Sequence, residues 1–251
     1  VEVYWRSGEV EITETDEPEL HAEESGGELS EDAAMHCLLA DGVLKIRFCG
    51  SGAKIRVNAA DKHLRLEVPA GIDLSVHTIS ALVKADALSP NPFLVAAFSG
   101  STELGTVTAA SVDLSSSSGA IRADNISAQS LTCSASSGSV AVGAVTAAAF
   151  DCTTSSGSVT ASSMVSESAQ ITTSSGSVEP ALTEVPSAEI HTSSGTVRLS
   201  LPEEGAEVLY ASSSGKLLTS RTYEQKGDLC VFGSGESSIT VETSSGNLEI
   251  K

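Results

Sequence analysis

The chain has 251 residues, of which 40% are hydrophobic and only 4% aromatic, so its core must be built from small and β-branched side chains. The formal net charge of −19 repels nucleic acid and anionic lipid and argues against DNA or RNA as a partner. No apolar run reaches the roughly 18 residues of a membrane span, and no signal peptide opens the chain. Because the first residue is Val1, we expect the numbering to begin inside a longer gene product.

Residues 1–70 show the alternation of apolar residues that is typical of strands, around Gly8 and Gly42, with long insertions between. One insertion, residues 14–32, holds nine acidic residues and no Lys or Arg. We interpret it as a solvated, partly disordered loop of an N-terminal cap. The alternative, a calcium or cationic-peptide site, has no EF-hand spacing to support it.

Basic residues concentrate just after this acidic segment. Six of the chain's 14 basic residues lie there: Lys45, Arg47, Lys54, Arg56, Lys62 and Arg65. They alternate with apolar positions, so we expect them to face outward. The simpler interpretation is a charged face that keeps a sheet edge soluble and pairs with the acidic loop. The sharper hypothesis is a binding face for an anionic polymer or for lipid headgroups.

Residues 71–220 repeat with a period of 19 residues. A Ser-Gly or Ser-Ser-Gly corner marks each repeat, with its glycine at Gly100, Gly119, Gly138, Gly157, Gly176 and Gly195, then at Gly215 after 20 residues and at Gly246 after 31. Hairpin loops vary in length, so constant spacing favours coils that stack on one another over an antiparallel meander. The sequence therefore predicts an all-β, parallel β-solenoid. It does not determine the handedness of the coil, for which we assume a right-handed winding.

Apolar residues recur 2, 4, 7, 9, 12, 14 and 16 residues after each corner glycine. Steps of two follow from the alternation of a strand, whereas each odd step requires a corner. We therefore predict three short strands per coil and a roughly triangular cross-section. Glycine can adopt a positive φ, and serine hydroxyls can bond backbone groups of a turn, so we expect both at the corner.

Residues 221–251 close the chain. Residues 221–236 break the period and predict an inserted hairpin, and the last coil, ITVETSSGNLEIK, regains the period and predicts the C-terminal cap. Capped ends are expected because open strand edges invite aggregation. We therefore expect one solenoid domain over 1–251, with irregular coils over 1–70 and regular coils over 71–220.

The sequence points to no catalytic, cofactor-binding or metal-binding residue. The five cysteines fall at apolar positions, which predicts buried, reduced thiols; a disulfide between stacked Cys133 and Cys152 is the minor alternative. Neither cysteines nor histidines have metal-ligand spacing, and no GxSxG or Walker motif occurs. A carbohydrate-active β-helix enzyme remains the alternative function, with Asp113, Asp151 and Glu189 on alternate coils about 9.6 Å apart.

Several motifs occur in a characteristic order: WRSGEVEI, a DGxLxI segment at 41–46, LEVPAG at 66–71, repeated TSSGSV units, LSLPEEG and a closing ETSSGNLEI. This order resembles the bacterial DUF4097 family of β-strand-repeat proteins, which are provisionally labelled adhesins. The resemblance covers nearly the whole chain. It implies an envelope-associated solenoid without known catalysis, related in some members to envelope stress response, and it supplies no functional residues. The chain departs from the family in its acidity, its five cysteines and Ala81 at a corner.

These features favour a noncatalytic scaffold or interaction module of the bacterial cell envelope or cell surface, close to a membrane. Its exposed ladders or its basic face would bind a protein, a peptide or a wall polymer. No cofactor is expected. End-to-end self-association is a third hypothesis. The ligand, the oligomeric state and the side of the membrane are left open by the sequence.

Overall fold

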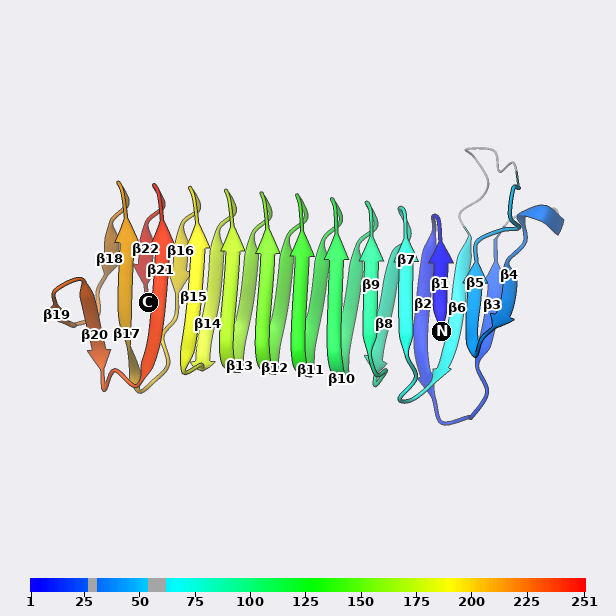
Figure 1. Ribbon diagram of the computed structural model, residues 1–251, viewed down its shortest axis with the longest axis horizontal. Coiled ribbons are helices and arrows are strands. Elements are labelled where there is room, and N and C mark those ends of the chain that lie inside the picture. Colours follow the sequence, from blue (N-terminus) through cyan, green and yellow to red (C-terminus); the bar gives the residue numbers. More distant parts are fainter. Residues whose placement is uncertain (27–30, 54–61) are drawn as a thin grey trace.

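A computed structural model describes residues 1–26, 31–53 and 62–251, and the chain winds into an elongated stack of coils (Figure 1). Successive regular coils pair in parallel and in constant register. Among the described residues, antiparallel pairs occur only toward the two ends. The predicted parallel β-solenoid is thus confirmed, and the antiparallel meander is not what forms.

The described elements comprise 22 strands and one short 3-10 helix. In chain order they are β1 (Glu2–Trp5), β2 (Glu9–Thr15), β3 (His21–Ser25), η1 (Glu31–Ala33), β4 (His36–Ala40), β5 (Val43–Arg47), β6 (His63–Pro69), β7 (Leu74–Thr78), β8 (Leu82–Leu88), β9 (Phe93–Ala97), β10 (Thr102–Ser116), β11 (Ile121–Ala135), β12 (Val140–Thr154), β13 (Val159–Thr173), β14 (Val178–Glu184), β15 (Ser187–Thr192), β16 (Val197–Leu199), β17 (Gly205–Ser212), β18 (Leu217–Thr219), β19 (Glu224–Lys226), β20 (Leu229–Gly233), β21 (Ser237–Thr243) and β22 (Leu248–Ile250). Within these described parts, no helix has both the length and the apolar character needed to cross a membrane.

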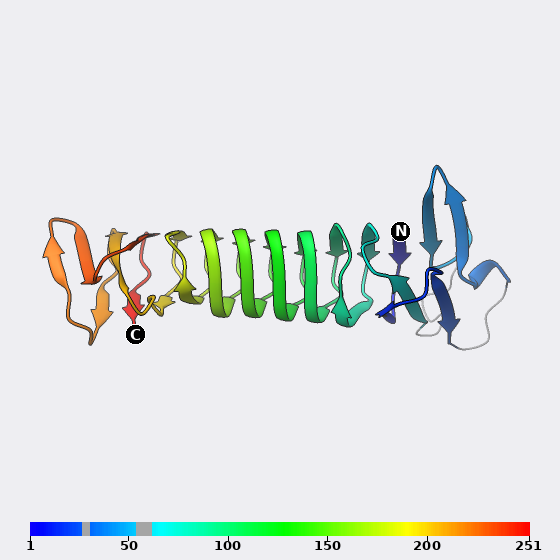
Figure 2. The same ribbon diagram turned by 90° about the horizontal axis from the view of Figure 1, so that it is seen from below.

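Each central coil is one long strand that bends twice. β10, β11, β12 and β13 have 15 residues each, and the pairing of β10 with β11 skips Gly105 and Ala110. The bends divide the coil into three sides, and buried side chains fall at the positions predicted from the period. The predicted three short strands are therefore one continuous strand, because its pairing with the next layer resumes directly after each skipped residue. Figure 2 shows these layers as evenly spaced ribs between two irregular ends.

The Ser-Ser-Gly corners stack closely on one another. A Cβ on Gly119 would lie 1.9 Å from the carbonyl oxygen of Gly100, and one on Gly138 would lie 1.9 Å from that of Gly119. The prediction that these glycines supply a positive φ is wrong, since the positive φ values of the described residues occur at other glycines, such as Gly42 and Gly71. Glycine is required at the repeated corners because the backbone of the preceding layer passes against its α-carbon.

A buried threonine completes several of these corners. The amide of Gly157 donates to Thr154 Oγ1 at 2.8 Å, and the amide of Gly176 donates to Thr173 Oγ1 at 3.1 Å. The hydroxyl contact to the turn was predicted for the corner serines, but the inward threonine makes it because its side chain is the one directed into the corner. The corner serines instead join neighbouring layers through backbone hydrogen bonds.

The layers do not follow chain order at either end. β1 lies between β5 and β7, and β2 lies between β6 and β8. At the other end β21 lies between β15 and β17, and β22 lies between β16 and β18. The last coil is therefore an inner layer, and the prediction that it forms the C-terminal cap is wrong. At the C-terminal end the chain passes over one layer position and later fills it with β21 and β22. At the N-terminal end β1 and β2 form a layer first, β5 and β6 then add on its outer side, and β7 and β8 add on its inner side.

Antiparallel strands cover the open edges of the outer layers. β3, which lies within the acidic segment 14–32, pairs with β6, and β4 pairs with β5. At the far end β20 covers β17. The acidic segment is thus partly a strand rather than only a solvated loop, because its backbone pairs with the edge of β6. One hydrophobic cluster, running from Val3 to Ile250, fills the interior of the stack.

Charged side chains alternate along one outer row, three residues after the corner. In spatial order the row reads Arg65, Glu11, Lys84, Glu103 and Arg122, then two uncharged layers, then Glu179, Arg198 and Glu249. Arg198 donates to Glu179 at 2.6 Å and to Glu249 at 2.8 Å. If the layers followed chain order, β6 would lie directly beside β8, and Arg65 and Lys84 would be neighbours of like charge. The alternation therefore favours the observed layer order over chain order.

Reversing one charge in this row tests its contribution. We expect Glu11→Lys to lower the free energy of unfolding by about 1–2 kcal/mol, because two opposite-charge neighbours, Arg65 and Lys84, become like-charge neighbours. Urea unfolding followed by circular dichroism measures the change. The matched control is Thr160→Lys, placed in the same row beside Glu179, which should leave stability unchanged or raise it slightly. Equal losses in the two variants would contradict a role for the alternation.

Candidate functional site

The structure describes four of the six predicted basic residues. Lys45, Arg47 and Arg65 reach the surface, as expected from the alternation. Lys54 and Arg56 lie outside the described residues. Lys62 is 1% exposed, so the expectation that it faces outward is wrong. The predicted basic face is therefore smaller than the sequence suggested.

Lys62 is enclosed at the N-terminal end of the core. Its ammonium group pairs with the Glu24 carboxylate and donates to the carbonyl oxygens of Ala33, at 2.7 Å, and Phe48. It also lies 5.1 Å from the ring centre of Trp5 and 4.2 Å from that of Phe48. A buried ammonium group needs partners of this kind. The sequence could not show them, because Glu24 reaches Lys62 only when β3 covers β6.

Aromatic and basic side chains stack on the outer wall of the same layers. The Tyr4 ring lies flat on His77 with ring centres 5.0 Å apart, and the Arg47 guanidinium lies 5.9 Å from the Tyr4 ring centre. The Tyr4 hydroxyl donates to the Glu2 carboxylate at 2.8 Å, and this hydrogen bond raises the pKa of Tyr4 and lowers that of Glu2. Lys45 pairs with the same carboxylate at 3.0 Å. The wall thus presents a fixed aromatic ring beside a guanidinium group.

Sequence reasoning missed a short row of exposed apolar side chains beside this wall. Ile79 and Phe98 lie on neighbouring corners, and both are exposed. Arg6 holds the same position in the adjoining layer. The sequence does reveal this row, because the position that holds Ile79 and Phe98 holds serine at every later corner. We call Tyr4, Arg6, Arg47, Ile79 and Phe98 the ridge patch.

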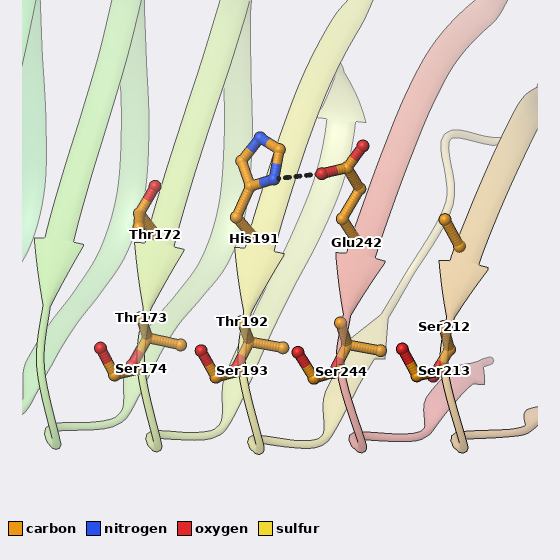
Figure 3. A pocket seen from close by; sticks show the side chains of 12 residues that line it. Thr172, Thr173, Ser174, His191, Thr192, Ser193, Ser212, Ser213, Glu242 and Ser244 are labelled. Atoms are coloured by element: carbon orange, nitrogen blue, oxygen red, sulfur yellow. Dashed lines mark hydrogen bonds and ion pairs between the residues drawn. The ribbon is translucent and has the colours of Figure 1, made fainter.

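A polar groove of about 540 Å³ crosses the layers toward the C-terminal end (Figure 3). His191 Nδ1 lies 3.1 Å from Glu242 Oε2, and His191 Nε2 lies 3.8 Å from Glu189. Figure 3 shows the imidazole beside the Glu242 carboxylate, with the serine hydroxyls in a separate row nearer the corners. The imidazole faces carboxylates rather than a hydroxyl, so the groove does not present a paired nucleophile and base.

The carboxylates of the enzyme hypothesis occupy one outer row. Asp113, Asp151 and Glu189 lie on alternate layers, with Thr132 and Gln170 between them. Two layers correspond to about 9.6 Å, the far end of the range for an inverting glycosidase. Burial raises the pKa of Asp113. The row does not favour a glycosidase over a set of solvated carboxylates.

Across residues 1–26, 31–53 and 62–251, no three His, Cys, Asp or Glu side chains are grouped so that they could hold a metal ion.

Three of the five cysteines belong to the core. Cys133, Cys152 and Cys230 are buried and free, and Cys133 lies beside Cys152 in the next layer. Cys37 is exposed, so the prediction that all five are buried is wrong; it lies on β4, which covers an edge rather than filling the core. Burial raises the pKa of Cys133 well above its ordinary value and that of Cys152 to about 12.

These thiols should differ in reactivity. In native protein at mildly alkaline pH we expect DTNB to react with Cys37 and to leave Cys133 and Cys152 unmodified, because the thiolate is the reactive form and the buried thiols stay protonated. Unfolding in urea should release the buried thiols. Mass spectrometry of the modified protein identifies the sites. Rapid native modification of Cys152 would contradict the expectation.

The fold and its surfaces define an elongated parallel β-solenoid with glycine-stacked corners and a chemically distinct N-terminal end. A model of the family described as Toastrack DUF4097 matches residues 1–251. The chain therefore belongs to the Toastrack DUF4097 family, and the resemblance seen in its motifs is confirmed.

Solved structures share this fold. A provisionally named lipid-binding protein from Parabacteroides distasonis is 17% identical, with a TM-score of 0.61 over 100% of this chain and 92% of that chain. A provisionally named adhesin from Bacteroides fragilis is 11% identical, with a TM-score of 0.54 over 100% of this chain and 91% of that chain. No curated protein matches. At these identities the likeness shows the fold alone.

Proposed function

We propose that this protein is a noncatalytic binding scaffold of the bacterial cell envelope and that its N-terminal layers contact the partner. Two lines support the proposal. The family match covers the whole chain, and two proteins of the same fold carry provisional names, one as an adhesin and one as a lipid-binding protein. The surface chemistry is also unequal along the stack.

The observation that carries the proposal is this contrast. The central corners repeat the same short hydroxyl side chains layer after layer. The N-terminal layers instead present exposed arginine, tyrosine and large apolar side chains, and arginine and tyrosine are enriched at binding hot spots. The C-terminal end also exposes Leu218 and Tyr223, but only the N-terminal layers combine exposed apolar side chains with the arginines of the ridge patch, so we propose that this end contacts the partner.

Sedimentation with bacterial envelope fragments tests the proposal. We expect the protein to bind the fragments and the variant Arg47→Glu/Arg65→Glu to lose most of this binding. The matched control is Lys216→Glu/Lys226→Glu, which changes the net charge equally with exposed residues at the C-terminal end. Failure of the unmodified protein to bind any envelope fraction, or equal loss in both variants, would refute the proposal.

A further inference from the structure

One outer row of the corners changes character at the N-terminal end. The residue two positions before the corner is serine in seven layers: Ser117, Ser136, Ser155, Ser174, Ser193, Ser213 and Ser244. In the three layers that precede them in space it is Arg6, Ile79 and Phe98, in that order. Ile79 is 55% and Phe98 63% exposed, so two large apolar side chains lie next to each other in water.

The backbone does not require apolar residues at these positions. The amide of Phe98 donates to the Thr78 carbonyl at 3.0 Å, and the amide of Ser117, one layer on, donates to the Ala97 carbonyl at 3.2 Å. The corner thus forms the same bond with either side chain. Because most of the Phe98 side chain lies outside the core, its place is not explained by packing. An exposed apolar row on an otherwise hydroxyl-lined edge marks a contact surface.

Positive charge adjoins the apolar row. Arg6 continues the row, and Arg47 lies on the wall beside it; among the ion pairs of the described residues, none involves either arginine. The nearest carboxylate in sequence to Arg6, that of Glu9, is paired with Lys84 at 3.0 Å. In Figure 1 the corners form the upper edge of the stack, whereas the acidic loop 16–20 lies at the lower edge. The cations therefore face away from loop 16–20.

We propose that the ridge patch docks the solenoid onto a phospholipid bilayer, with Ile79 and Phe98 inserted at the boundary of headgroups and acyl chains and Arg6 and Arg47 against lipid phosphates. The apolar side chains project from tight corners, and a bilayer accepts projecting side chains without a matched pocket. Tyr4 belongs to the residue types favoured at this interface. Binding at a membrane interface strengthens with the apolar area buried and with electrostatic attraction to anionic lipid, and the ridge patch offers both. The inference rests on the proposed envelope location and names what the N-terminal layers contact.

The net charge of −19 repels anionic lipid from the molecule as a whole, so this contact depends on the charges nearest the bilayer. In physiological salt, charges are screened over about 8 Å, so the charges that lie near the bilayer dominate its interaction with the protein. A bilayer at the corner edge therefore interacts with Arg6 and Arg47 rather than with the acidic loop at the opposite edge. We expect the rest of the protein surface, rather than the ridge patch, to repel anionic lipid.

Vesicle flotation tests the proposal with the whole chain. The variant Ile79→Ser/Phe98→Ser places at both positions the residue of the later corners, so it should fold and melt like the unmodified protein. We expect the unmodified protein to float with vesicles of equal parts phosphatidylcholine and phosphatidylglycerol. The serine pair should lower the partition coefficient about tenfold or more for each apolar side chain removed. The matched control, Leu218→Ser, removes a 44% exposed side chain at the opposite end and should bind normally.

A second variant separates charge from insertion. Arg6→Ser should weaken binding to the mixed vesicles about fivefold and weaken binding to phosphatidylcholine alone much less, because phosphatidylcholine has no net charge. Absence of flotation of the unmodified protein, or equal flotation of the serine pair, would overturn the proposal. A dimer that the serine pair converts to a monomer, in a protein that does not float, would replace the bilayer with a second copy of the chain. Binding to envelope fragments without binding to protein-free vesicles would overturn this inference and leave the scaffold proposal standing.

Discussion

Replacing Gly138 by alanine is expected to lower the free energy of unfolding by about 3 kcal/mol or more. The added Cβ would lie 1.9 Å from the Gly119 carbonyl oxygen and 2.8 Å from its carbonyl carbon, so two stacked backbones would have to separate. Both contacts are to backbone atoms, which cannot move aside as a flexible side chain could. Urea unfolding followed by circular dichroism measures the loss.

The control for this variant is Ser137→Ala, one residue earlier at the same corner. Ser137 is exposed, and we expect its replacement to change stability by no more than about 0.5 kcal/mol. Because each layer contacts only its neighbours, the damage should be local. Hydrogen exchange should accelerate first in β11 and β12, on either side of the corner. Equal stability of the two variants would show that the layers can separate at little cost.

Replacing Lys62 by methionine is expected to destabilise the N-terminal layers by about 3–5 kcal/mol, because it leaves a carboxylate without its partner in a mostly buried place. Glu24 retains only 10% of its side-chain exposure and pairs with Lys62 there. Trp5, the only tryptophan of the chain, packs beside Lys62, so its fluorescence reports unfolding of these layers alone.

A double variant distinguishes the buried pair from general damage. Lys62→Met/Glu24→Gln removes both charges and should recover part of the loss, since the cost arises chiefly from the unpaired carboxylate. Lys45→Met is the surface control; its pair with Glu2 is only partly buried and in contact with water, so we expect a loss of at most about 1 kcal/mol. If Lys62→Met were no worse than Lys45→Met, the buried pair would not hold the N-terminal end together.

The inward positions of the central coils could be predicted because they depend only on local geometry. Strand alternation and a constant period place Leu104, Val107 and Val112 in the core whichever layer comes next. The same reasoning found the repeated corner at Gly119 and Gly138. It assigned the wrong reason to the glycines, since their need for space comes from the preceding layer and not from their own φ.

The ridge patch shows a similar division. The change from serine to Ile79 and Phe98 at one position of the corner is visible in the printed sequence once the period is known. That Arg6 continues this row is not visible, because β1 and β2 are separated from β7 and β8 along the chain and join them only by insertion between layers. The patch therefore combines residues from two distant parts of the chain.

The sequence by itself determined the class of fold, the period and the inward face of each regular coil, because a repeated local pattern specifies how a single layer is built. Only the tertiary structure decided the order of the layers, the burial of Lys62 against Glu24 and the chemistry of the N-terminal edge. The physical reason is that every layer offers nearly the same hydrogen-bonding edge to its neighbour. Which layer is next depends on outward contacts between distant segments, such as Glu11 between Arg65 and Lys84, and these exist only once the stack has formed.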